Sequence, residues 1–131
     1  MQFNRLLPEL SVTDINKTKA FYIDLLGFKL EYERPENKFM FLSFEGSQFM
    51  FEQIHDDGWN TAKFEYPLGR GINFSIETDN IDILYQKLID ADYPMFRPMM
   101  TSQYRMNDEW LQQKQFLVQD PDGYLLRFNQ E

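Results

Sequence analysis

One pattern occurs twice along the chain: a strand, an acidic capping residue and a helix. Residues 10–15 (LSVTDI) align with residues 74–81 (FSIETDNI), and both segments lead into further β-rich stretches. A sheet of three or four strands covered on one face by its own helix leaves the other face to be covered by the second repeat or by a ligand. We therefore predict an α+β fold of two βαβββ modules that form a curled mixed sheet around an open cavity, within a single domain of 131 residues.

The first module is predicted over about residues 5–54. Alternating apolar residues indicate a strand within 6–12, with Leu6, Leu10 and Val12 on one face. A helix follows, capped by Thr13 or Asp14 and ended by Gly27. Three β-rich segments complete the module: FKLEYER, KFMFLSFE and SQFMFEQI.

A linker over about residues 55–70 separates this module from the second, predicted over about 71–131. The second module begins with the strand GINFSIETD and a helix capped by Asp79 or Asn80. We expect a loop around QYRMNDEW, residues 103–110, and then the strand QKQFLVQ. The turn DPDG leads into the last strand, which turns Leu126 and Phe128 toward the helix and Arg127 toward the cavity.

Composition restricts the partners of the chain. The net charge of −8 and pI near 4.6 argue against nucleic acid or an anionic membrane surface and favour a cationic ligand, although many acidic surfaces serve only solubility. The absence of cysteine excludes disulfides, thiol nucleophiles and thiolate metal sites. The first ten residues lack the apolar run of a signal peptide, and no segment has the length of a membrane span, so we expect a cytoplasmic protein.

Three motifs, in this order and spacing, resemble one known superfamily: ELSVTDINKTKAFYIDLLGF, FSIETDNIDILYQKL and DPDGYLLRF. The chain is similar to the vicinal oxygen chelate superfamily, which includes glyoxalase I, extradiol dioxygenases, fosfomycin-resistance enzymes and bleomycin-resistance proteins. The resemblance implies two βαβββ modules around a U-shaped cavity that a second subunit often completes. It also implies metal ligands at fixed points on the strands of the enzymes.

Carried over to this sequence, those ligand positions fall on Leu7, Glu52, Gly71 and Arg127. Leucine has no lone pair, glycine has no side chain and arginine is a permanent cation, so three of the four positions cannot bind a divalent metal. Glu9 also faces the cavity and could pair with Glu52, which still leaves no third ligand. We therefore predict no metal and no cofactor.

The bleomycin-resistance proteins of that superfamily similarly lack the metal ligands and sequester a bulky cationic glycopeptide in grooves of a dimer. Resemblance to this branch is carried by the basic Arg127 after DPDG, by Trp110 before the preceding strand and by Phe39 at the start of the third strand. It implies that the chain is a metal-free homodimer that binds a small molecule of the bleomycin type.

The chemistry of the candidate site residues suits such a ligand. Aromatic rings offer stacking surfaces to a heteroaromatic tail and attract a cation, for which the candidates are Trp110, Phe39, Tyr104 and Trp59. The polar cavity candidates are Glu9, Glu52, Asn73 and Arg127. Core packing or dimer contact is the competing explanation for the aromatic residues, and a structural ion pair with Arg127 is the competing explanation for the carboxylates.

Two other functions remain open at this point. The first is a metal-dependent lyase, isomerase or dioxygenase that uses Glu52 and Glu9 as ligands or acid/base groups. The second is an interaction module whose cleft is filled by its own side chains.

Overall fold

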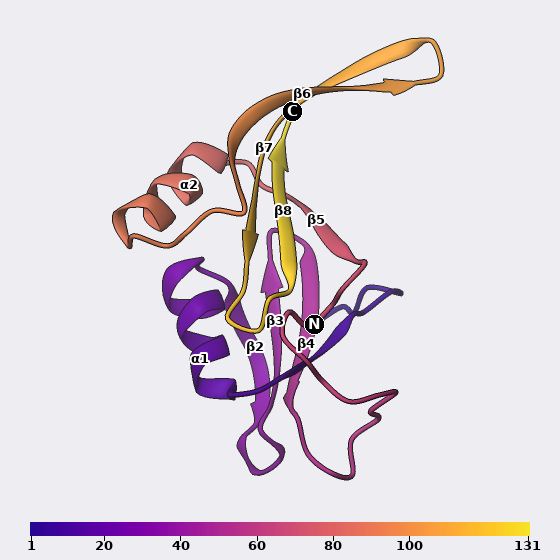
Figure 1. The fold of residues 1–131 in the computed structure, drawn as a ribbon, viewed down its shortest axis with the longest axis vertical. Coiled ribbons are helices and arrows are strands. Elements are labelled where there is room, and N and C mark those ends of the chain that lie inside the picture. The colour runs from indigo at the N-terminus through magenta and orange to yellow at the C-terminus, as the bar shows by residue number, and fades with distance from the viewer. The chain divides into compact units, whose positions relative to one another are not determined.

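A computed structural model describes all of residues 1–131. The chain divides into two compact units, Met1–Tyr66 and Pro67–Glu131. Each unit contains one four-stranded mixed sheet and its own helix, as the repeat predicted (Figure 1). No helix has the length and apolar character needed to cross a membrane.

The first unit has strand order β1-β4-β3-β2, with β1 parallel to β4 and the other pairs antiparallel. Its elements are β1 (Glu9–Val12), α1 (Ile15–Lys19), the π-helical turn η1 (Ala20–Leu25), β2 (Lys29–Arg34), the short 3₁₀ turn η2 (Pro35–Asn37), β3 (Phe39–Phe44) and β4 (Ser47–Gln53). Tyr22 from η1 packs on Phe51 of β4 with ring centroids 4.6 Å apart, and both side chains are fully buried. The helical segment therefore covers the apolar face of the sheet.

The helix of the first unit begins and ends where the sequence predicts. Asp14 is the N-cap, and its Oδ1 accepts hydrogen bonds from the backbone N–H groups of Asn16 and Lys17. Gly27, with φ of 86°, lies just after the helical segment. The prediction for Leu6 is wrong: β1 starts at Glu9 and Leu6 is 84% exposed, because the preceding Pro8 has no N–H to donate to a strand partner.

The second unit repeats this topology with strand order β5-β8-β7-β6 and a parallel β5–β8 pair. Its elements are β5 (Asn73–Glu77), α2 (Ile81–Asp90), β6 (Arg97–Met106), β7 (Glu109–Gln119) and β8 (Leu125–Gln130). Phe116 and Phe128 are fully buried, and the ring of Tyr85 from α2 lies 5.0 Å from that of Phe116. Here too the helix covers the apolar face of its own sheet.

The loop predicted at residues 103–110 is wrong. The strands β6 and β7 continue to Met106 and Glu109, which pair across the two-residue turn Asn107–Asp108. Asn107 has φ of 56°, a left-handed conformation that asparagine tolerates better than most residues. The segment is exposed on both faces, so it lacks the apolar alternation that reveals a strand, and Figure 1 shows this hairpin extending away from the rest of the second sheet.

The last strand follows the predicted DPDG turn. The carboxylate of Asp120 accepts the N–H groups of Asp122 and Tyr124, both at 2.9 Å, and Gly123 has φ of 95°. Leu126 and Phe128 are fully buried on the helix side, while Arg127 alternates to the other face.

In both units an equivalent hydrogen bond joins the start of the helix to the sheet. The amide oxygen of a glutamine in or at the end of the closing strand accepts the N–H of the first helical residue: Gln53 from Ile15 and Gln130 from Ile81, each at 3.0 Å. Because the first N–H groups of a helix have no partner within the helix, this contact satisfies one of them.

Candidate ligand-binding site

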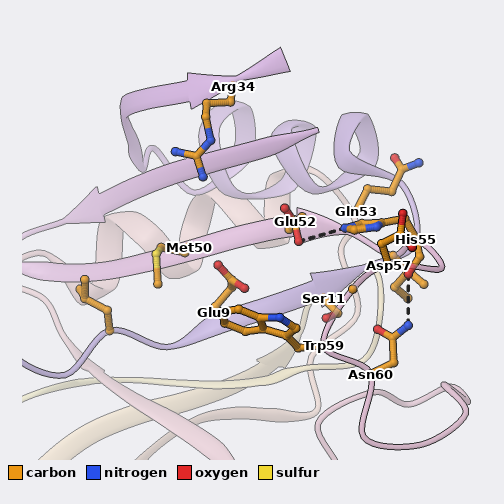
Figure 2. Close-up of a pocket in the computed structure, with 13 residues that line it drawn as sticks. Glu9, Ser11, Arg34, Met50, Glu52, Gln53, His55, Asp57, Trp59 and Asn60 are labelled. Carbon is orange, nitrogen blue, oxygen red and sulfur yellow. Dashed lines mark hydrogen bonds and ion pairs between the residues drawn. The ribbon is translucent and has the colours of Figure 1, made fainter. Parts of the chain in front are cut away.

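The first unit contains a cavity of about 560 Å³ on the sheet face opposite α1 (Figure 2). Alternation along β1 turns Glu9 and Ser11 toward this face and Leu10 and Val12 into the core. The parallel register places Ser11 beside Glu52. Its lining is Leu7, Glu9, Ser11, Arg34, Met50, Glu52, Gln53, Ile54, His55, Asp57, Gly58, Trp59 and Asn60.

Acidic side chains dominate the charge of this cavity. Partial burial, and next the negative charge of Glu52, raise the pKa of Glu9, while the nearby Arg34 acts in the opposite direction. His55 Nε2 lies 3.3 Å from Glu52 Oε2. The carboxylate pair therefore favours a bound proton or a bound cation.

An exposed ring is part of the cavity wall. Trp59 is 95% exposed and comes from the loop after β4, where the carbonyl oxygen of His55 accepts the N–H of Gly58 and the Nδ2 of Asn60, each at 3.1 Å. Figure 2 shows Trp59 in the same cavity as Glu9 and Glu52. Its ring face is available to stack on a planar or cationic group.

Phe39 lies on the same face of the first sheet, directly across from Glu52 in the β3–β4 register. Its side chain is 3% exposed, and the guanidinium carbon of Arg34 lies 3.9 Å from the ring centroid. Sequence reasoning did not identify Arg34. The signal was its position across the short PEN turn from Phe39, which makes the two residues cross-strand neighbours.

The remaining predicted site residues belong to the second unit. Asn73, Tyr104 and Arg127 lie on the sheet face opposite α2, by the register of β5 with β8 and of β6 with β7. Trp110 pairs with Arg105 and lies on the opposite face of the β6–β7 hairpin from Tyr104, where it is 66% exposed. Within this unit the hairpin therefore separates the two aromatic candidates.

The residues present do not fit the metal of the enzymes that the sequence resembles. Leu7 lines the cavity without any donor atom, Gly71 has no side chain and Arg127 is a cation. In neither unit do three His, Cys, Asp or Glu side chains form a group that could hold a metal ion.

Two βαβββ units, the first with a polar cavity on the open face of its sheet, define a two-module α+β protein. The model of the Glyoxalase/Bleomycin resistance protein/Dioxygenase superfamily matches residues 2–128, and the chain belongs to this superfamily.

The chain is also similar to individual proteins. A "Bleomycin resistance protein" of Geobacillus stearothermophilus and one of Staphylococcus aureus are each 29% identical over 95% of this chain and 95% of their own length. A solved superfamily member from Vibrio splendidus 12B01 is 38% identical over 95% of this chain and 97% of its own, with a TM-score of 0.44. The structure of TioX from Micromonospora sp. ML1 covers 98% of both chains at 16% identity and a TM-score of 0.73, which supports the fold alone.

Proposed function

We propose that this protein binds and sequesters a bulky cationic or aromatic small molecule as a metal-free homodimer. The observation that carries the proposal is the cavity of the first unit, where Glu9 and Glu52 share one sheet face with the exposed ring of Trp59. Two carboxylates supply negative charge, and the ring supplies a flat apolar surface. A planar cation is the ligand that uses both.

The energetics of the carboxylate pair support a cationic ligand. Partial burial, and next the negative charge of Glu52, raise the pKa of Glu9, so its carboxylate is less favourable in the cavity than in water. A bound cation would compensate the charges of Glu9 and Glu52, so part of the binding free energy would come from the unfavourable state of the empty site. The volume of about 560 Å³ is within the range of about 300 to 1,000 Å³ common for small-molecule sites.

The relatives direct this proposal to an antibiotic of the bleomycin type, because their printed name is bleomycin resistance protein. The homodimer is part of the proposal. Met106 and Trp110 on the β6–β7 hairpin are 48% and 66% exposed, and apolar surface of this kind supports contact with a second copy.

Fluorescence titration with bleomycin tests the proposal. In a Trp110→Phe background the remaining tryptophan is Trp59, so saturable quenching reports the cavity of the first unit. We expect one ligand per chain, recovered unchanged after release, and about tenfold weaker binding in Glu52→Gln because a charge-assisted contact is lost.

Glu131→Gln is the matched control, because it removes the same charge at the exposed C-terminus. Equal loss of affinity in Glu131→Gln and Glu52→Gln would mean that only net charge matters. Absence of saturable quenching by bleomycin, or its chemical conversion, would overturn sequestration of this compound.

A metal-dependent lyase, isomerase or dioxygenase is the second candidate, favoured by the raised pKa of Glu9 beside Glu52, which suits a proton-transferring group. Metal analysis of protein purified without chelators separates the two functions. Stoichiometric metal together with turnover of a substrate would replace the binding function, and we expect neither.

A further inference from the structure

A second group of polar side chains lies on the open face of the second sheet. Gln115 of β7 is 3% exposed, and its Nε2 donates to Ser102 Oγ at 3.0 Å and to Tyr104 Oη, both on β6. Both hydrogens of this amide are therefore used, and both hydroxyl oxygens act as acceptors. The Ser102 hydroxyl is also hydrogen-bonded to Tyr104, so the hydroxyl hydrogen of Tyr104 is the one available to donate to a ligand.

Arg127 of β8 brings a positive charge to the same face. Its side chain is half-buried, and no carboxylate of the second unit forms an ion pair with it. Arg127 Nε and Gln115 Oε1 are both buried without a hydrogen-bond partner. The guanidinium of Arg127 is hydrogen-bonded to the Tyr104 hydroxyl, but its Nε has no partner, so a negative group beside this partly buried charge would be stabilised.

The pKa of Tyr104 reflects the electrostatic surroundings of its hydroxyl. The pKa of Tyr104 is lowered, first by the hydrogen bond from Gln115 and then by Ser102 and Arg127, against the opposing effect of burial. Tyr104 is 39% exposed, so its hydroxyl is within reach of a ligand. The surroundings of Tyr104 Oη therefore stabilise a negatively charged oxygen.

We propose that Tyr104 and Arg127 bind the carboxylate of a small molecule, with Gln115 and Ser102 holding the Tyr104 hydroxyl in place. The guanidinium and the phenol both donate to the carboxylate oxygens, and the planar guanidinium matches the shape of that group. The net charge of −8 repels anions at long range, so binding depends on these short-range contacts. This site stands on the second unit alone and is independent of the proposed function of the first.

Calorimetric titration with three probes of similar shape tests the site: benzoate, neutral benzamide and benzylamine, in a buffer without carboxylate, phosphate or sulfate. We expect the affinity for benzoate to exceed that for benzamide by a factor of about ten or more. Arg127→Gln should lower the affinity for benzoate by a similar factor. Arg105→Gln is the matched control: it removes the same charge from β6, and Arg105 pairs with Trp110 on the opposite face from Tyr104, so benzoate binding should be unchanged.

A spectroscopic readout locates the bound probe. A carboxylate beside Tyr104 disfavours the phenolate, so benzoate should raise the pKa of Tyr104. Phenolate absorbance measures this pKa, and the change caused by benzoate should be absent in Tyr104→Phe. Equal affinity for benzamide and benzoate would identify a neutral amide site, since an amide offers a donor to Gln115 Oε1 and an acceptor to Arg127 Nε, and would overturn the proposal. So would equal losses in Arg105→Gln and Arg127→Gln.

Benzylamine separates this proposal from the function proposed for the first unit. Its binding should weaken in Glu52→Gln and be unaffected by Tyr104→Phe. If the protein binds benzylamine but not benzoate, only the carboxylate site is overturned. If it binds benzoate but not benzylamine, only the cation site is overturned.

Discussion

The two units have the same scaffold and opposite charges at one equivalent position. In the first unit Ser11 pairs with Glu52 between the parallel strands, and in the second unit Ser75 pairs with Arg127 in the same place. The topology decides which positions face away from the helix, because strand order and register are repeated. The side chain at each position then sets the local charge of the face, negative at Glu52 and positive at Arg127, and the two proposed ligands differ in charge accordingly.

The units also differ in the strands that follow the helix. β2 and β3 are 6 residues each, whereas β6 and β7 are 10 and 11 residues and form the extended hairpin. The added length carries Tyr104 and Trp110 on opposite faces of one ribbon. The two units therefore share the buried core and differ in the open face and the hairpin.

The largest expected effect tests whether the two cores are equivalent. Phe51 and Phe128 are both fully buried, so Phe51→Ala and Phe128→Ala should each lower the free energy of unfolding by about 3 to 5 kcal/mol. Urea denaturation measures both losses. Phe96→Ala is the control: Phe96 is 41% exposed, so its truncation should lower the free energy of unfolding much less. A small loss at only one of the two buried positions would show that the units do not rely equally on their cores.

The helix N-termini provide a smaller effect that separates the units. Asp14 accepts two backbone N–H groups, while Asn80 at the equivalent position makes no side-chain capping bond. Asp14→Ala should therefore cost about 1 kcal/mol of unfolding free energy, and Asn80→Ala only a small fraction of it. Thermal denaturation of the two variants measures the difference, and equal costs would show that Asp14 does not act through its capping bonds.

Much of the fold could be predicted because it depends on local signals repeated along the chain. The alignment of residues 10–15 with 74–81 matches the structure. Leu10 pairs with Phe51 in the first unit, and Phe74 pairs with Leu126 at the equivalent position of the second. The hairpin at residues 103–110 escaped prediction because strands exposed on both faces have no apolar alternation. The prediction for Leu6 failed because the apolar pattern begins at residue 6, whereas the strand begins only after Pro8, at Glu9.

Prediction of the site was limited by contacts between distant residues. Glu9, Glu52 and Trp59 were named from the sequence, and the structure brings them into one cavity. The position of Arg34 over Phe39 depends on the pairing of β2 with β3, and the bonds of Gln115 to Ser102 and Tyr104 depend on the pairing of β6 with β7. Polar residues in strands give no sign of their partners until that register is known.

The smallest expected effect concerns protonation, where the two units shift acids in opposite directions. Glu9 has a pKa above its ordinary 4.5, so the fold loses stability as pH rises from 4.5 through the raised value, and Glu9→Gln should remove that loss. Tyr104 has a pKa below its ordinary 10.0, so stability rises with pH from the lowered value up to 10.0.

The causes of these shifts can be exchanged for neutral groups one at a time. Glu52→Gln should lower the pKa of Glu9 only in part, because burial is the larger cause, and carboxyl carbon NMR shifts measure it. Gln115→Leu and Arg127→Gln should each raise the pKa of Tyr104, because the first removes the largest single cause and the second removes both a hydrogen bond and a positive charge, and phenolate absorbance measures both changes. A raised pKa at both Glu9 and Tyr104 would mean that burial and the net charge of the chain outweigh the hydrogen bonds and the positive charge around Tyr104.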